Sequence, residues 1–337
     1  MDFLQKRDRD VWAQWDEWAQ QLEPDIRRTF LETMAALKEA LSVSLMTTLL
    51  ASGDMTQLAR HVTEALGNLE ALQDVLKDSI VRGGTKVAAS LPDRIIVRFD
   101  RYNPEVIERV NREALQFVQQ ITNDVRDSLV DIVRTGLSEG IGPGATAQRI
   151  KSEIGLTQRQ RKAVDNFRRM LAEGDRTVLT RELRDRRFDR TLEQVFNGQR
   201  NLTADEIRTM TDRYAERYIK HRAEVIARTE SIRAQAVGNS QAWAQAVQQN
   251  PGLRQRLRRR WYVAPSEGPS SHKVKGKVGH KPKSGKSVVR LCPICRAIPG
   301  MNSEGRQVDE PFQTPNGPTM YPPIHPNCRC VVFTGVV

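Results

Sequence analysis

Five residues near the carboxyl end of the chain have the types and spacing of metal ligands. All four cysteines lie there, in Cys292-Pro-Ile-Cys295 and in Cys328-Arg-Cys330, and His325 precedes the second pair. Two close pairs of thiolates, brought together by folding, supply the four tetrahedral positions that zinc prefers. We therefore predict a Zn²⁺ bound by Cys292, Cys295, Cys328 and Cys330. His325 is the substitute for one of the second pair, because His-x-x-Cys also fits a turn.

The predicted zinc is structural rather than catalytic. Paired cysteines in a reducing cytosol favour a metal over a disulfide or unbound thiols, and four thiolates leave no open position for a catalytic water. A structural zinc contributes about 10–16 kcal/mol in peptide models, which is comparable with the net stability of a whole domain, about 5–15 kcal/mol. Zinc can therefore fix the shape of a terminal segment that is rich in Pro and Gly and poor in apolar side chains.

A basic run precedes and adjoins these cysteines. The chain has a net charge of +12, and residues 251–290 hold 12 basic residues and one acid, Glu267. This run predicts contacts with phosphate; the alternative is a solubilising loop beside an acidic neighbour. The residues predicted to contact DNA are Arg258, Arg259, Arg260, Lys273, Lys275, Lys277, Lys281, Lys283 and Lys286.

The sequence contains no convincing set of catalytic residues. The sequence has no Gly-rich phosphate loop followed by Lys and Ser/Thr, and no G-x-S-x-G nucleophile motif. His61 and His221 fall on predicted helices, as surface or core residues. Arg228-Thr229-Glu230 could form a polar site, but on a long helix such a set is more often an ion-pair or hydrogen-bond anchor. We expect no enzymatic activity.

Long helices must carry most of the chain. Apolar residues recur at three-to-four-residue spacing from Ile26 to Leu45, from Val106 to Leu137 and from Ile207 to Val237, as on the buried faces of amphipathic helices. Two of the helix starts, Thr157–Gln160 and Thr203–Glu206, have the pattern of a capping box.

Two features of the first hundred residues concern packing. Trp12, Trp15 and Trp18 form one aromatic face, which we interpret as a packing face rather than a cofactor site; its partner could be another chain. Gly83-Gly84 interrupts the helical pattern. The apolar run Ile95–Phe99 that follows is a candidate strand.

The sequence changes character after residue 250. Arg258–Val263 and Val288–Leu291 have the pattern of strands, and residues 264–287 between them are rich in Gly, Ser, Pro and Lys, which predicts a flexible insertion. The expected fold class is therefore mainly α (α+β), with a long helical amino-terminal and central region and a small zinc-stabilised α+β module at the carboxyl end. The expected domains are residues 1–95, 96–250 and 251–337.

Nothing in the sequence predicts a membrane segment. The amino terminus mixes charges and has no apolar signal-peptide core. The most apolar stretch, residues 41–51, is too short to span a bilayer. We expect a protein made in the cytosol, with no membrane partner.

Five motifs follow one another in order from residue 222 onward. They are Arg222-Ala-Glu-Val-Ile-Ala-Arg-Thr-Glu230, Trp261-Tyr-Val263, Cys292-Pro-Ile-Cys295, Asp309-Glu-Pro-Phe312 and Pro322-Pro-Ile-His-Pro-Asn-Cys-Arg-Cys330. In this order they resemble the phage Mu F-like minor capsid, or head morphogenesis, family. The resemblance spans about residues 100–335.

The resemblance implies a minor structural protein of a tailed phage. Such a protein would lie in the virion, inside the capsid near the portal, after assembly in the host cytoplasm. It would act in head morphogenesis, DNA packaging and ejection, with the portal protein and the major capsid or scaffolding protein as partners, and without catalytic residues. The basic insertion departs from the family pattern, and we expect it to make sequence-independent contacts with double-stranded DNA. The alternatives are a zinc-containing nuclease or phage-delivered effector enzyme, and a freestanding nucleic-acid-binding regulator.

Overall fold

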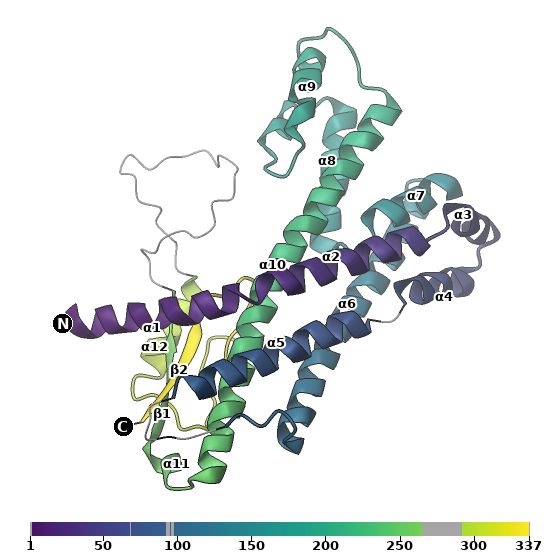
Figure 1. Ribbon diagram of the computed structural model, residues 1–337. Helices are drawn as coiled ribbons and strands as arrows, with labels where there is room; N and C mark the ends of the chain where they lie inside the picture. Colours follow the sequence, from purple (N-terminus) through teal and green to yellow (C-terminus); the bar gives the residue numbers. More distant parts are fainter. Residues whose placement is uncertain (1, 68, 92–94, 96–97, 265–291, 337) are drawn as a thin grey trace. The chain divides into compact units, whose positions relative to one another are not determined.

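The protein is mainly helical, with 71% helix and 5% strand (Figure 1). The computed structural model describes residues 2–67, 69–91, 95, 98–264 and 292–336, and for residues 2–9 it describes the backbone alone. Within these residues no single helix is long and apolar enough to cross a membrane; the bent pair Asp10–Ala40 and Val43–Ser52 meets the length and composition criteria only when its halves are joined.

The elements follow one another as a series of helices interrupted by one pair of strands. The first five helices are α1 Asp2–Gln20, α2 Glu23–Ala40, α3 Val43–Ser52, α4 Met55–Leu66 and α5 Glu70–Ala89. The central elements are α6 Pro104–Ser138, α7 Pro143–Glu153, α8 Gln158–Glu173, the 3₁₀ turns η1 Arg176–Thr180 and η2 Arg186–Phe188, α9 Asp189–Phe196 and α10 Ala204–Gln249. The last are α11 Leu253–Arg256, β1 Leu257–Tyr262, α12 Pro293–Met301 and β2 Val331–Val336.

Both predicted capping boxes are present at helix starts. Before α8, the backbone N–H of Gln160 donates to Thr157 Oγ1 (3.4 Å) and the N–H of Thr157 donates to Gln160 Oε1 (3.0 Å). Before α10, Glu206 and Thr203 exchange the same two bonds at 3.2 and 2.9 Å. These bonds satisfy amide groups that the first turn of a helix leaves without partners, so local sequence fixes where both helices begin.

The chain forms two compact units, each assembled from segments that are distant in sequence. Unit 1 comprises residues 1–27, 73–114 and 225–337, and unit 2 comprises residues 28–72 and 115–224. The expected consecutive domains therefore do not coincide with these units. Residues 251–337 share unit 1 with the first helix instead of standing alone.

The core of unit 1 contains the amino-terminal tryptophan face. Trp12 and Trp15 are buried and belong to one apolar cluster with Trp243 of α10 and Val331 of β2. The indole N–H of Trp12 donates to the backbone carbonyl of Arg329 at 2.7 Å. The face is thus a packing face, as interpreted, and its partner is the carboxyl-terminal part of the same chain.

The two strands pair in antiparallel fashion, with Trp261 opposite Val332. The expected strand at 258–263 is present as β1, whereas β2 had no distinctive pattern in the sequence. The described residues of the run Ile95–Phe99 are not in a strand, and the strand expected at 288–291 and the insertion expected at 264–287 fall, apart from Ala264, outside the described residues.

Glycines bring α5 and α10 into close contact within unit 1. Helix α5 runs through Gly83 and Gly84 without a break, contrary to the expectation from sequence. A Cβ on Gly238 of α10 would lie only 2.4 Å from the backbone nitrogen of Gly84 and 2.6 Å from the carbonyl oxygen of Ile80. The glycine pair therefore serves close packing of two helices rather than a turn.

The core of unit 2 is crossed by buried charged side chains. Arg222 of α10 is 5% exposed, pairs with Asp124 of α6 and donates to the carbonyl of Gly155. Gly155 has φ +87°, and a Cβ there would lie 2.6 Å from Met34 Sδ. The turn between α7 and α8 is therefore fixed by a glycine backbone and one guanidinium.

Candidate metal centre

The first ligand pair lies at the amino-terminal end of α12. Cys292 is the N-cap residue, Pro293 occupies the first helical position, and Cys295 lies in the first turn. Proline favours this position because its missing N–H is not needed there. Residues three apart on a helix lie on one face, so the two thiols point the same way. The Cys-x-x-Cys pair is thus positioned by the start of a helix.

The second group of ligands lies on the loop formed by residues 321–330. The backbone N–H of Asn327 donates to Thr229 Oγ1 (3.0 Å), and the Tyr321 hydroxyl donates to Glu113 Oε1 (2.8 Å). Both partners belong to unit 1, Thr229 on α10 and Glu113 on α6. Helical side chains therefore position the loop independently of any ion.

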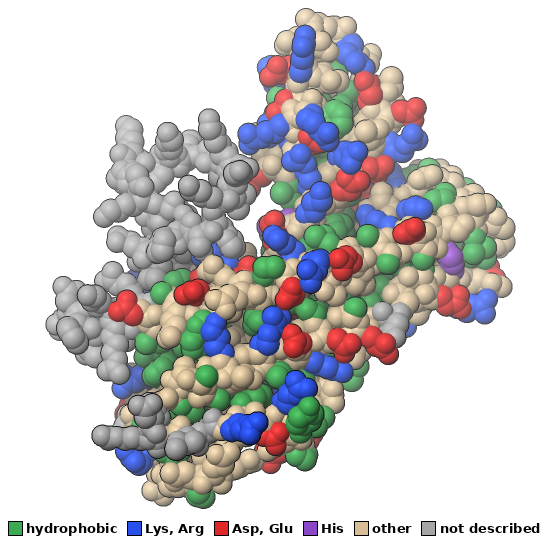
Figure 2. Space-filling model, in the orientation of Figure 1, with side chains coloured by type: hydrophobic (Ala, Val, Ile, Leu, Met, Phe, Trp, Pro, Cys, Tyr) green, Lys and Arg blue, Asp and Glu red, His purple; other side chains and the backbone are tan. Residues whose placement is uncertain are grey.

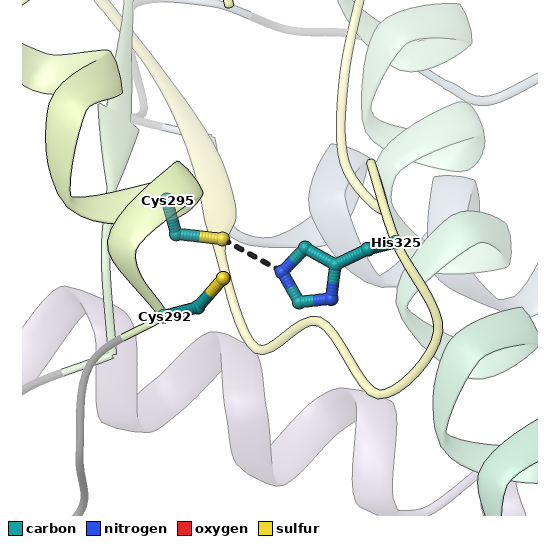
Figure 3. A group of neighbouring side chains, drawn as sticks. All are labelled: Cys292, Cys295 and His325. Atoms are coloured by element: carbon teal, nitrogen blue, oxygen red, sulfur yellow. Dashed lines mark hydrogen bonds between the residues drawn. The ribbon is translucent and has the colours of Figure 1, made fainter. Parts of the chain in front are cut away.

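The structure brings all five predicted ligands together around Cys295. The ligand atoms of Cys292, Cys295 and His325 lie within 4.8 Å of one another, as do those of Cys295, Cys328 and Cys330. Cys295 Sγ is 2.9 Å from His325 Nε2 and 3.9 Å from Cys328 Sγ. Figure 3 shows the first group, with Cys292 and Cys295 facing the imidazole ring across the gap between α12 and the loop.

The orientation of the His325 ring suits a metal ligand. Its Nδ1 is 2.8 Å from the carbonyl oxygen of Pro326. Because a carbonyl only accepts, Nδ1 carries the hydrogen and the lone pair of the neutral ring is on Nε2, the atom that faces Cys295. Metal-binding histidines are usually fixed by such a bond from the other ring nitrogen.

Without a cation, the buried sulfurs share protons rather than ionise together. Hydrogen bonds from the thiols of Cys295 and Cys330 lower the pKa of Cys328 to about 2. The hydrogen bond to Cys328 raises the pKa of Cys295 to about 12, and hydrogen bonds to Cys295 and Cys328 raise the pKa of Cys330 well above its usual range. The cluster thus holds one thiolate readily, and further thiolates require a positive charge among them.

These features fit a metal ion. The zinc–sulfur distance of about 2.3 Å implies a tetrahedral sulfur–sulfur edge of about 3.8 Å, close to the 3.9 Å between Cys295 and Cys328. The sulfurs of Cys295, Cys328 and Cys330 lie in an apolar cluster with Ile298 and Phe312, where unpaired charge is costly. This cluster also means that the carboxyl-terminal segment has a small apolar core of its own, beyond what composition predicted.

The Cys295–His325 pair also has the spacing of a nucleophile and its base. Cys295 is only 3% exposed, however, and its sulfur contacts a second sulfur. A substrate would have to reach a buried atom between two other ligands. The arrangement therefore favours ion binding over covalent catalysis.

The residues predicted to contact DNA have different placements. Along β1, side chains alternate between the two faces, so Leu257, Arg259 and Trp261 are buried, whereas Arg260 is exposed and Arg258 half-buried. The six lysines from Lys273 to Lys286 lie outside the described residues.

Arg259 organises a loop instead of meeting solvent. It is 3% exposed, and its guanidinium donates to the backbone carbonyls of Gln307 and Met320, both at 2.9 Å, and to that of Glu310. Burial lowers its pKa to about 10. Because the guanidinium is buried and each of its three nitrogens already bonds to a loop carbonyl, Arg259 cannot present its charge to phosphate, so it does not belong among the DNA contacts.

The Arg228-Thr229-Glu230 set is the anchor that the sequence favoured. Buried Arg228 pairs with Asp16 at 3.5 Å and with Glu23 at 2.5 Å. Glu230 accepts from Arg233 at 2.9 Å, and burial raises the pKa of Glu230. No signal in the sequence pointed to Glu113 or to Trp12 as supports of the cysteine loop.

No family model matches the chain, and no curated protein or solved structure shows detectable similarity to it.

Proposed function

We propose that this protein is a minor structural protein of a tailed-phage head, acting in head morphogenesis at the portal. The observation that carries the proposal is that residues from all five resembling motifs pack together in unit 1. Thr229 of the first bonds to Asn327 of the last (3.0 Å). Trp261, Cys295 and Phe312, from the other three, share one apolar cluster with Cys328 of the last, and the rings of Trp261 and Phe312 lie 5.3 Å apart. Motif residues that hold one another in place support a structural role for the whole series.

The cysteine cluster would hold one Zn²⁺ as a structural ion in this protein. Five donors surround a site that takes four, so one of them is in excess. We favour Cys292, Cys295, Cys328 and His325 as ligands and Cys330 as a neutral thiol. Four thiolates would leave two net negative charges around the ion and three thiolates one, which costs less in apolar surroundings.

Two further features support this choice of ligands. The Nε2 lone pair of His325 already faces Cys295, with the ring fixed through Nδ1. Cys330 also lines a small apolar cavity with Trp15, Ile232 and Val332. An uncharged thiol suits that environment, whereas a thiolate does not.

Contact with DNA would be sequence-independent and supplied by the basic run, without Arg259. Arg260 is the exposed described member of the predicted set. Sequence-independent contact with DNA agrees with a protein located beside the packaged genome. The portal protein and the major capsid or scaffolding protein would be its protein partners in the virion.

The test is to locate the chain in particles. We expect it to co-purify with the portal and to remain in DNA-filled heads, where cryo-electron microscopy would show its helices near the portal. Absence from both portal complexes and filled heads would overturn the proposal. Metal-dependent cleavage of DNA or RNA by the purified chain would favour the nuclease or effector alternative instead.

A further inference from the structure

A second concentration of positive charge lies in unit 2, on residues 157–203, which we call the arm. The arm comprises α8, η1, η2, α9 and the turns beside them. It holds 12 basic and seven acidic residues, a net charge of +5. Because residues 251–290 account for +11 of the chain's +12, the other 250 residues sum to −4. The arm is therefore basic on a background that is otherwise slightly acidic.

Most carboxylates of the arm are already paired. Asp185 pairs with Arg187 and Arg217, Asp189 with Arg184, Glu173 with Arg169 and Asp165 with Arg168. Five exposed cations have no ion pair with any described residue, and they are Arg159, Lys162, Arg176, Arg186 and Arg190. Only two exposed carboxylates of the arm, Glu182 and Glu193, are likewise unpaired. The surface thus keeps an excess of free positive charge.

The free cations lie on the outer side of the elements that carry them. On α8, Val164, Phe167 and Met170 are buried, while Arg159 and Lys162, three residues apart, are exposed on the other side. Figure 2 shows Lys and Arg side chains gathered over α9 and the adjoining part of α10 within this unit.

The cations of the second half of the arm have defined anchors. Arg186 lies in η2 and Arg190 in the first turn of α9, four residues further on. The Arg176 guanidinium is 5.9 Å from the centre of the Phe196 ring, an orientation that leaves its charge unneutralised. These side chains are held on short elements that contact one another and are tied to Arg217 of α10 through Arg184 and Asp185, rather than on a free tail.

The composition of this surface favours nucleic acid over protein. Protein interfaces are usually centred on buried apolar and aromatic residues. The arm has no exposed large apolar side chain, although such residues occur elsewhere, for example Leu115 and Leu137. Arginine guanidinium groups bind phosphate through two parallel hydrogen bonds. A phosphate backbone matches dispersed cations that lack an apolar centre.

We propose that the arm is a second, sequence-independent contact surface for duplex DNA, formed by Arg159, Lys162, Arg176, Arg186 and Arg190. The inference rests on the proposed function in naming DNA as the polyanion, but it uses none of the residues assigned above to DNA contact. Each phosphate contact makes the slope of log K against log salt concentration steeper by about 0.9.

The experiment compares full-length variants by fluorescence anisotropy with a labelled DNA duplex of arbitrary sequence over a salt series. The test variant carries Arg159→Gln, Lys162→Gln, Arg186→Gln and Arg190→Gln. Its matched control removes the same charge from exposed or half-buried residues that are ion-paired, through Arg60→Gln, Lys77→Gln, Arg82→Gln and Arg112→Gln. A third variant with Arg159→Lys, Arg186→Lys and Arg190→Lys keeps every charge.

We expect the test variant to lose up to roughly 3.6 from the magnitude of the salt slope, and the control and the lysine variant to stay near the parent. Equal slopes for the test and control variants would overturn the arm proposal. That result is distinguishable from failure of the basic run, because deletion of residues 273–286 would then still weaken binding. Failure of the head-protein proposal would show independently, in the particle analysis.

Discussion

The indole nitrogen of Trp12 lies 2.7 Å from the carbonyl oxygen of Arg329, a residue 317 positions later in the chain. Arg329 separates Cys328 from Cys330. The first helix therefore holds the backbone of the cysteine loop directly between two candidate ligands. Packing of the amino-terminal helix and binding of metal should depend on each other.

Replacing Trp12 by Phe tests this dependence. The variant keeps an aromatic ring but leaves the Arg329 carbonyl without its donor, at a cost of about 1–3 kcal/mol. We expect a lower free energy of unfolding for unit 1 and a weaker affinity for Zn²⁺, measured by denaturant titration and by competition with a chromophoric chelator. Trp18→Phe is the control, because Trp18 packs on Trp15 and has no such bond. An unchanged zinc affinity in Trp12→Phe would show that metal binding does not depend on the packing of α1.

Removing the metal should loosen unit 1 alone. Zinc binding contributes about 10–16 kcal/mol in small zinc peptides, and here the ligands join α12 to the loop that contacts α1 and α10. We expect chelation to raise amide hydrogen exchange in residues 292–301 and 321–336 and in α1. Residues 115–224 of unit 2 are the internal control. If amide exchange in these segments of unit 1 were the same before and after chelation, the ion would not be structural.

Ligand variants should separate the five donors. Cys295 belongs to both groups of ligands, so Cys295→Ser should abolish stoichiometric zinc. We expect His325→Ala to lose zinc as well, and Cys330→Ala to retain it at one ion per chain by elemental analysis. Cobalt substitution gives a second readout, since thiolate-to-cobalt absorption should fall in Cys328→Ser and stay unchanged in Cys330→Ala. The reverse pattern for His325 and Cys330 would establish four thiolates.

Because α5 and α10 are in close contact, adding one methyl group between them should strongly lower the stability of unit 1. Gly238→Ala would bring a Cβ into the backbone of Gly84, and overpacking typically costs about 1–3 kcal/mol. We expect at least that loss in the free energy of unfolding of unit 1. Gly144→Ala in α7 is the control, because its Cβ would meet only Thr47 Cγ2, at 3.9 Å, and alanine favours a helix by about 0.5–1 kcal/mol over glycine. A free energy of unfolding of Gly238→Ala equal to that of the parent would show that α5 and α10 can move apart without cost.

Asp185 should make unit 2 sensitive to acid. The side chain of Arg187 donates to its carboxylate, and this bond together with Arg217 lowers the pKa of Asp185 to about 2. A folded-state pKa below the ordinary aspartate value of 3.8 contributes stability above about pH 4 that is lost as the pH falls toward 2.

The variant Asp185→Asn isolates that contribution. It should be less stable than the parent near neutral pH and approach the parent as the pH falls from 4 to 2, in denaturant titrations followed at each pH. A stability difference that is the same at all pH values would mean that the carboxylate charge plays no part.

Much of this arrangement was predictable from sequence because its causes are local. Both capping boxes depend on residues three apart, and the long apolar stripes impose helices whatever they pack against. The Cys-x-x-Cys spacing likewise places two thiols on one face without information from the rest of the chain. The placement of Arg259 was also predictable: once Trp261 is a core residue of a strand, its neighbour two positions earlier must share the buried face.

Other features depend on contacts that no local pattern encodes. Gly83-Gly84 reads as a helix interruption until Gly238 is known to lie against it. The acidic partners of Arg228 come from α1 and α2, more than 200 positions away in the sequence in the case of Asp16. The division into units also depends on pairing between distant segments, which is why consecutive domain boundaries did not describe it.

The dependence of unit 1 on both α1 and β2 has a consequence during synthesis. After Trp12 is synthesised, 317 more residues must be added before its acceptor exists, whereas all residues of unit 2 (28–72 and 115–224) are made before residue 225. Nascent chains should therefore carry an uncovered tryptophan face for most of translation. Interrupted chains would keep that face exposed to chaperones and proteases, so that mainly chains translated through β2 would escape degradation.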